Sequence, residues 1–88
     1  MHIYWFKDSK TGHLKQVDAL LNELKKDSKF LLTHVDCLDK KFSLENIECI
    51  FAEPPKTNQT VVLIGAGHGV YENILNSKKF LIKNFNTQ

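Results

Sequence analysis

Two short turns that combine glycine with histidine constrain this chain more than any other feature. Thr11-Gly12-His13 follows the apolar run of residues 3–6, and Gly65-Ala66-Gly67-His68-Gly69 follows the apolar run of residues 61–64. A helical pattern begins directly after each turn. Open α/β sheets bind ligands at such places, because the carboxyl end of a strand and the positive amino end of the next helix face the same crevice. The two turns therefore predict where a binding site lies, although not its chemistry.

The spacing of the apolar residues alternates between strand-like and helix-like along the chain. β-Branched and aromatic runs predict strands, and apolar residues three or four apart predict helices with one buried face. Thr11 is the expected N-cap of the first helix, and the polar pair Asn76-Ser77 is expected to end the last one. The predicted strands cover residues 2–6, 30–35, 60–64 and 80–82, and the predicted helices cover 14–24 and 70–75.

Residues 42–52 fit two patterns. The spacing of Leu44, Ile47, Ile50 and Phe51 fits a helix. That of Ile47, Cys49 and Phe51 fits the alternation of a strand. We favour a helix that starts after a Ser43 cap, because two parallel strands need a covering crossover between them.

Strands and helices in alternation predict an α/β fold. We expect a small three-layer, Rossmann-like parallel sheet of about four strands, with helices on both faces, in one domain over residues 1–88. In the commonest small order of this kind the first and third strands are neighbours. Both glycine–histidine turns would then lie side by side.

Composition excludes several classes of protein. A net charge of +2, with the basic residues all Lys and spread along the chain, argues against nucleic-acid binding. No apolar stretch approaches the ~20 residues that span a bilayer, and no signal peptide is visible, so a cytoplasmic protein is expected. Cys37 and Cys49 form no close pair, which leaves a zinc motif or a disulfide unsupported. Both thiols are expected to be reduced and partly buried.

The glycine-rich turn departs from the dinucleotide fingerprint, because Val70 stands where the third glycine belongs. We therefore expect no cofactor. Gly65 and Gly67 fit either a tight turn with close helix packing or a site where exposed amides bind an anion or hydroxyl. His13 and His68 fit acid–base, metal-binding or hydrogen-bonding roles, or the simple capping of a turn. We assign no catalytic residue and no metal ligand.

The two motifs resemble a known family. Lys10-Thr11-Gly12-His13-x-x-Gln16 after the first strand, and Ile64-Gly65-Ala66-Gly67-His68-Gly69 after a later one, are similar to the amino-terminal half of the mitochondrial-fission "elongated mitochondria" family. That family resembles two-domain glycosyltransferases of the B type. Its Gly-His-x-x-Gln and Ile-Gly-Ala-Gly turns match this chain position by position at Gly12, His13, Gln16, Gly65, Ala66 and Gly67.

The resemblance implies half of a cleft. Family members are several times longer, and B-type enzymes grip the nucleotide-sugar mainly with a carboxyl-terminal domain. The chain would then be a truncated or split acceptor-binding or partner-binding side, inactive alone, that joins a second α/β domain or a second copy of itself. Two alternatives stay open: a small non-catalytic α/β module that dimerises or docks, and a stand-alone nucleotide- or phosphate-binding domain. The expected binding residues are Lys10, Thr11, Gly12, His13, Gln16, Gly65, Ala66, Gly67, His68 and Gly69.

Overall fold

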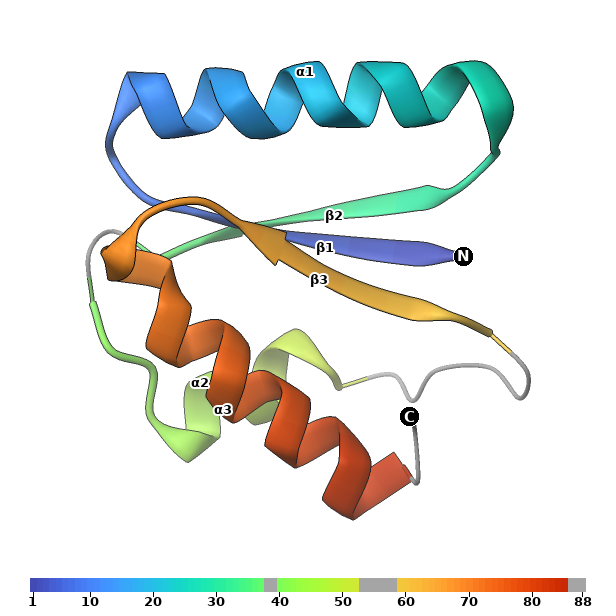
Figure 1. Ribbon diagram of the computed structural model, residues 1–88. Coiled ribbons are helices and arrows are strands. Elements are labelled where there is room, and N and C mark those ends of the chain that lie inside the picture. Colours follow the sequence, from blue (N-terminus) through green and yellow to red (C-terminus); the bar gives the residue numbers. More distant parts are fainter. Residues whose placement is uncertain (38–39, 53–58, 86–88) are drawn as a thin grey trace.

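Strands and helices alternate from one end of the chain to the other (Figure 1). The computed structural model describes residues 1–37, 40–52 and 59–85. The elements in chain order are β1 (His2–Lys7), α1 (Thr11–Asp27), β2 (Leu31–Asp36), α2 (Leu44–Ile50), β3 (Val61–Gly65) and α3 (His68–Phe85).

The described strands form one parallel, three-stranded sheet in the order β2-β1-β3. In register, Tyr4 of the central strand β1 lies between Thr33 of β2 and Leu63 of β3. The expectation that the first and third strands are neighbours is therefore confirmed. The central position also explains why β1 is the most buried of the described strands, since both of its faces are covered.

Helices cover both faces of the sheet, with α1 on one side and α2 and α3 on the other (Figure 1). Alternate residues of β1 point to opposite faces. Ile3 and Trp5 pack in a cluster with α1, while Tyr4 and Phe6 pack in the larger cluster with α2 and α3. The three-layer α/β architecture thus follows from the two-residue period of one strand.

The ambiguous segment before the third strand is helical. Ser43 is the N-cap of α2, and its hydroxyl accepts a hydrogen bond from the Asn46 amide at 3.2 Å. The Asn46 side chain in turn accepts from the backbone N–H of Ser43 at 3.0 Å, which completes a reciprocal capping box. Ile47 faces the core, so the helical spacing decides this segment.

The predicted fourth strand is wrong. Residues 80–82 belong to α3, which runs without interruption from His68 to Phe85. Its buried side chains, Val70, Asn73, Ser77 and Leu81, recur every three or four residues, which is the helical period. Asn76 and Ser77 do not end the helix, because no glycine or proline follows them and because Ser77 is packed against the core. The described part of the chain therefore has three strands.

The two cysteines are both free, as expected, but they differ in burial. Cys37 is buried in the core below the sheet, whereas Cys49 is exposed on α2. The expectation of partial burial is wrong for each, because Cys37 packs in the core cluster with Phe6 and Ile47 while Cys49 lies on the outer side of a short helix.

None of the helices in the described residues is both long enough and apolar enough to cross a membrane.

Candidate functional site

The loops after β1 and β3 meet at one end of the sheet. Because the two strands are parallel neighbours with Phe6 opposite Gly65, the chain leaves both strands at the same edge. A Cβ atom placed on Gly67 would lie 2.4 Å from Nδ1 of His13, so the two loops are in direct contact. The predicted juxtaposition of the two turns is therefore present in the structure.

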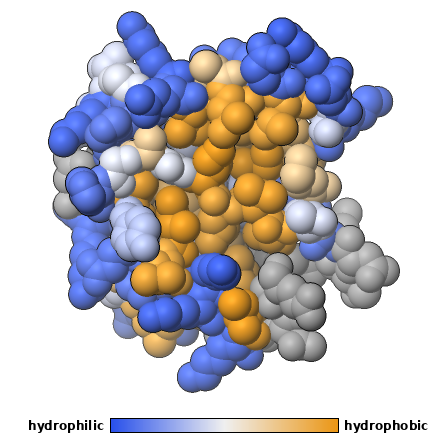
Figure 2. Space-filling model, viewed as in Figure 1, coloured by the Kyte–Doolittle hydropathy of each residue, from blue (hydrophilic) through white to orange (hydrophobic). Residues whose placement is uncertain are grey.

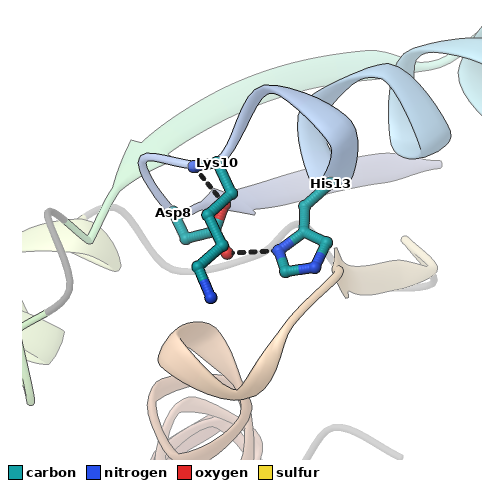
Figure 3. Close-up of polar contacts among 3 residues, drawn as sticks. All are labelled: Asp8, Lys10 and His13. Carbon is teal, nitrogen blue, oxygen red and sulfur yellow. Dashed lines mark hydrogen bonds and ion pairs between the residues drawn. The ribbon is translucent and has the colours of Figure 1, made fainter.

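An aspartate–histidine pair forms the centre of this region (Figure 3). Oδ2 of Asp8 lies 2.6 Å from Nδ1 of His13. The other carboxylate oxygen accepts a hydrogen bond from the backbone N–H of Lys10 at 3.0 Å. The Asp8 side chain is 2% exposed and that of His13 is 31% exposed, so the carboxylate is enclosed while the imidazole reaches the surface.

Local sequence explains how this pair arises. Asp8 follows the last residue of β1, and His13 lies in the first turn of α1. Because helical side chains tilt toward the N-terminus of their helix, that of His13 points back toward the end of β1. Lys10, not the predicted Thr11, occupies the N-cap position, and no side chain caps the helix there. The reason is that Asp8 already fixes the turn by accepting the Lys10 amide, so the helix begins one residue earlier than the Thr11 cap requires.

The pair defines the electrostatics of the site. The hydrogen bond from His13 lowers the pKa of Asp8 below its ordinary value, and the Lys10 amide adds to this effect while burial opposes it. An ionised Asp8 can only accept, so Nδ1–H of His13 donates the hydrogen bond, and in this tautomer the lone pair of the ring is on Nε2. Within the described residues no hydrogen-bond partner of Nε2 is present. His13 is therefore oriented by one nitrogen and available to a ligand through the other.

Gly67 is required for this arrangement. Its φ is +98°, a conformation that residues with a side chain rarely adopt. A Cβ at this position would also lie 2.6 Å from Oδ2 of Asp8, in addition to its collision with His13. Gly65 is similarly crowded, since a Cβ there would lie 2.7 Å from the carbonyl oxygen of Phe6. Of the two alternatives for these glycines, close packing in a tight turn is thus shown.

Asp8 and His13 line a cleft of about 660 Å³, a volume within the range of small-molecule sites. One wall carries the polar groups of the first loop, and the other carries the glycine turn and the first turns of α3. The lining residues are Asp8, Lys10, His13, Gly65, Gly67, His68, Gly69, Val70, Tyr71 and Ile74.

The expected binding residues separate into two groups. Those that line the cleft are Lys10, His13, Gly65, Gly67, His68 and Gly69. The others, Thr11, Gly12, Gln16 and Ala66, do not line it. Thr11, Gly12 and Gln16 are exposed on α1, and Ala66 packs against the apolar cluster beneath that helix. Nothing lies within 4 Å of a Cβ built on Gly12, so no close approach requires glycine there.

Asp8 is absent from the expected binding residues. The available signal was an acidic residue directly after a buried strand and five positions before a histidine. The apolar wall of Val70, Tyr71 and Ile74 is also absent from them, because the spacing of these residues indicates a helix and gives no sign of a ligand.

The site offers proton transfer and hydrogen bonding. A carboxylate-oriented imidazole can accept or donate a proton at Nε2, and Lys10 adds a positive charge beside it. No group of three or more His, Cys, Asp or Glu side chains that could hold a metal ion occurs in the part of the chain that the structure describes.

Comparisons with known proteins add no identification. No protein-family model, no curated protein and no solved structure matches the chain. The resemblance to the "elongated mitochondria" family thus rests on the residues of the two turns alone.

Proposed function

We propose that this chain is the acceptor side of a glycosyltransferase-like cleft, incomplete and inactive by itself. In this proposal the cleft binds a hydroxyl-bearing acceptor, and Nε2 of His13 accepts the hydroxyl proton as the oxygen attacks the anomeric carbon of a nucleotide-sugar donor. The bond between that carbon and the diphosphate breaks at the same time, and the nucleoside diphosphate leaves. The donor would be held by a second α/β domain. The observation that carries the proposal is the 2.6 Å contact between Asp8 and His13 at the wall of the cleft.

The chemistry of the pair supports this assignment. A hydroxyl group is a poor nucleophile, and a positioned base that removes its proton typically accelerates attack by about 10²–10⁴-fold. Asp8 holds the imidazole in one orientation and stabilises the imidazolium that forms. Tyr71 and Ile74 add apolar surface of the kind on which a sugar ring packs.

The same cleft lacks the groups that usually bind a nucleotide-sugar. The chain contains no arginine for a forked grip on the diphosphate, and among the described residues Lys10 is the one lysine that lines the cleft. The isolated chain is therefore expected to transfer no sugar.

Binding can be tested by titrating the isotope-labelled chain with methyl glycosides and with UDP-glucose while amide shifts are followed. The proposal expects millimolar binding of a glycoside, with shifts at Lys10, His13 and the 67–69 turn. His13→Asn, which has an amide nitrogen near the position of Nδ1 but no counterpart of Nε2, should weaken this binding, whereas Gln16→Ala on the exposed face of α1 should not. UDP-glucose should bind no more tightly than the glycoside.

Two results would contradict the proposal. Saturable micromolar binding of UDP-glucose at residues 65–69 would instead indicate a self-sufficient nucleotide site. The absence of any glycoside-dependent shift would favour the second candidate, a non-catalytic α/β interaction module. The specific observation in favour of that candidate is an uncovered apolar edge on β3, which lies outside the cleft.

A further inference from the structure

Among the described strands, β3 lies at an edge of the sheet, and its outer backbone groups face no other described strand. The N–H of His2 donates to the carbonyl of Thr60 at 2.9 Å, which sets the alternation of the parallel ladder. Val62 and Ile64 therefore direct their N–H and C=O groups toward β1, while Val61 and Leu63 direct theirs away from the sheet. No described strand pairs with this outer side.

The side chains around this edge are almost entirely apolar. A groove of about 290 Å³ runs between β3 and α3 and contains a single charged side chain, that of Lys78, among its lining residues. The lining consists of Val61, Val62, Leu63, Ile74, Lys78, Leu81 and Ile82. Figure 2, which views the molecule as Figure 1 does, shows apolar surface gathered across the middle of this face, over β3 and below α1.

Natural sheets usually protect an exposed edge with charged residues, proline, a bulge or a very short strand. The five residues of β3, Val-Val-Leu-Ile-Gly, include no charge and no proline, and all are only partly buried. Such a composition is typical of an interior strand, which has a neighbouring strand on each side.

The direction of the crossovers indicates which kind of strand belongs there. α1 covers one face and joins β1 to β2, whereas α2 covers the opposite face and joins β2 to β3 on the other side of β1. α3 lies on the same face as α2 (Figure 1). A parallel strand joined to β3 through α3 by a right-handed crossover would therefore lie on the free edge of β3. We infer that the free edge of β3 is an interface for a fourth, parallel, apolar strand from a further α/β segment.

Charge favours such a partner over a second copy of this chain. Two copies pairing antiparallel through the centre of β3 would bring the Lys78 side chains toward each other, because Lys78 shares its groove with Leu63, the central residue of the strand. None of the described residues that line the groove is acidic. The incoming strand should therefore present apolar side chains and, opposite Leu63, a carboxylate that pairs with Lys78. This inference depends on the sheet and not on the acid–base chemistry of the cleft.

The interface can be tested by extending the whole chain beyond Gln88 with a flexible Gly/Ser linker and the strand Thr-Val-Glu-Val-Thr. The matched probe is Thr-Val-Lys-Val-Thr. The glutamate strand should raise the midpoint of thermal unfolding by roughly 5–10 °C over a linker-only extension. It should also slow hydrogen exchange of the Val61 and Leu63 amides by about tenfold or more. The lysine strand should give a smaller effect, and Lys78→Glu, an exposed substitution, should reverse the order of the two probes.

Three results would overturn the inference. The glutamate strand could leave both the midpoint and the exchange of Val61 and Leu63 unchanged. Lys78→Glu could leave the order of the probes as it was. The unextended chain could dimerise in analytical ultracentrifugation with concentration-dependent protection of the Leu63 amide, which would assign the edge to a second copy. None of these measurements involves a sugar, so failure here is distinct from failure of the proposed function.

Discussion

Replacing Gly67 by alanine should be among the most damaging single-methyl changes in this chain. The added Cβ would lie 2.4 Å from Nδ1 and 2.6 Å from Cε1 of His13, and 2.6 Å from Oδ2 of Asp8. Neither neighbour can easily retreat, since each holds the other by their hydrogen bond and the Asp8 side chain is enclosed. The substitution therefore strains the backbone and breaks the Asp8–His13 pair together.

The expected cost follows from two contributions. A side chain at a φ of +98° costs about 1–2 kcal/mol. Overpacking against fixed neighbours adds about 1–3 kcal/mol. The free energy of unfolding should therefore fall by about 2–5 kcal/mol, a large part of the total for a small domain.

Urea denaturation followed by circular dichroism measures this loss. Gly12→Ala is the matched control, because nothing lies within 4 Å of its Cβ and it sits in the first turn of α1. It should leave stability unchanged or raise it by up to about 1 kcal/mol. If Gly67→Ala is too unstable to study, His13→Ala combined with Gly67→Ala should be less destabilised than the sum of the two single changes, since the smaller side chain relieves the collision. Equal stability of Gly67→Ala and the unaltered chain would refute the reasoning.

Three further predictions concern single polar side chains. Folding lowers the pKa of Asp8, so the stabilising contribution of this carboxylate is present above the unfolded-state pKa of about 3.9 and is lost as the pH falls through the folded-state pKa. In urea titrations across acidic pH, the unfolding free energy of Asp8→Asn should therefore fall less steeply with decreasing pH than that of the unaltered chain. Asn73→Ala leaves the Phe42 N–H and the Lys40 carbonyl without their 2.7 Å partners, and should lower the unfolding free energy by about 2–4 kcal/mol in the same assay, whereas an unchanged value would disprove the bridging role. Ser77→Ala should raise thermal stability by about 0.5–1 kcal/mol, because the buried Ser77 hydroxyl has no hydrogen-bond partner in the described structure; a loss of stability would show that the hydroxyl is satisfied.

Local pattern was sufficient for most elements. In each of the three strands and in α1, the apolar residues recur with a period that differs from that of the neighbouring segments. Such a period depends only on residues a few positions apart. Ser43 and Asn46 define the start of α2 in the same local way, through a reciprocal cap three residues long. The expectation that the two glycine turns meet also followed from sequence, because the order of parallel strands is restricted by their crossovers.

The extent of α3 shows where local pattern fails. Phe80, Leu81 and Ile82 form a short apolar run that fits a strand as well as a helix. Packing decides between them: Leu81 and Val70 belong to one buried cluster against the sheet, which is possible only if the helical spacing continues between them.

Tertiary structure also decided which residues form the candidate site. Sequence alone located the strand ends and the histidine-bearing turns, since glycine, histidine and apolar runs mark these positions locally. It did not distinguish Asp8 from other polar residues of its turn, nor Gly67 from Gly12. Those distinctions arise because the β1–β3 pairing presses Gly67 against a histidine that Asp8 holds in place, and such a contact between loops far apart in the chain exists only after the sheet has formed.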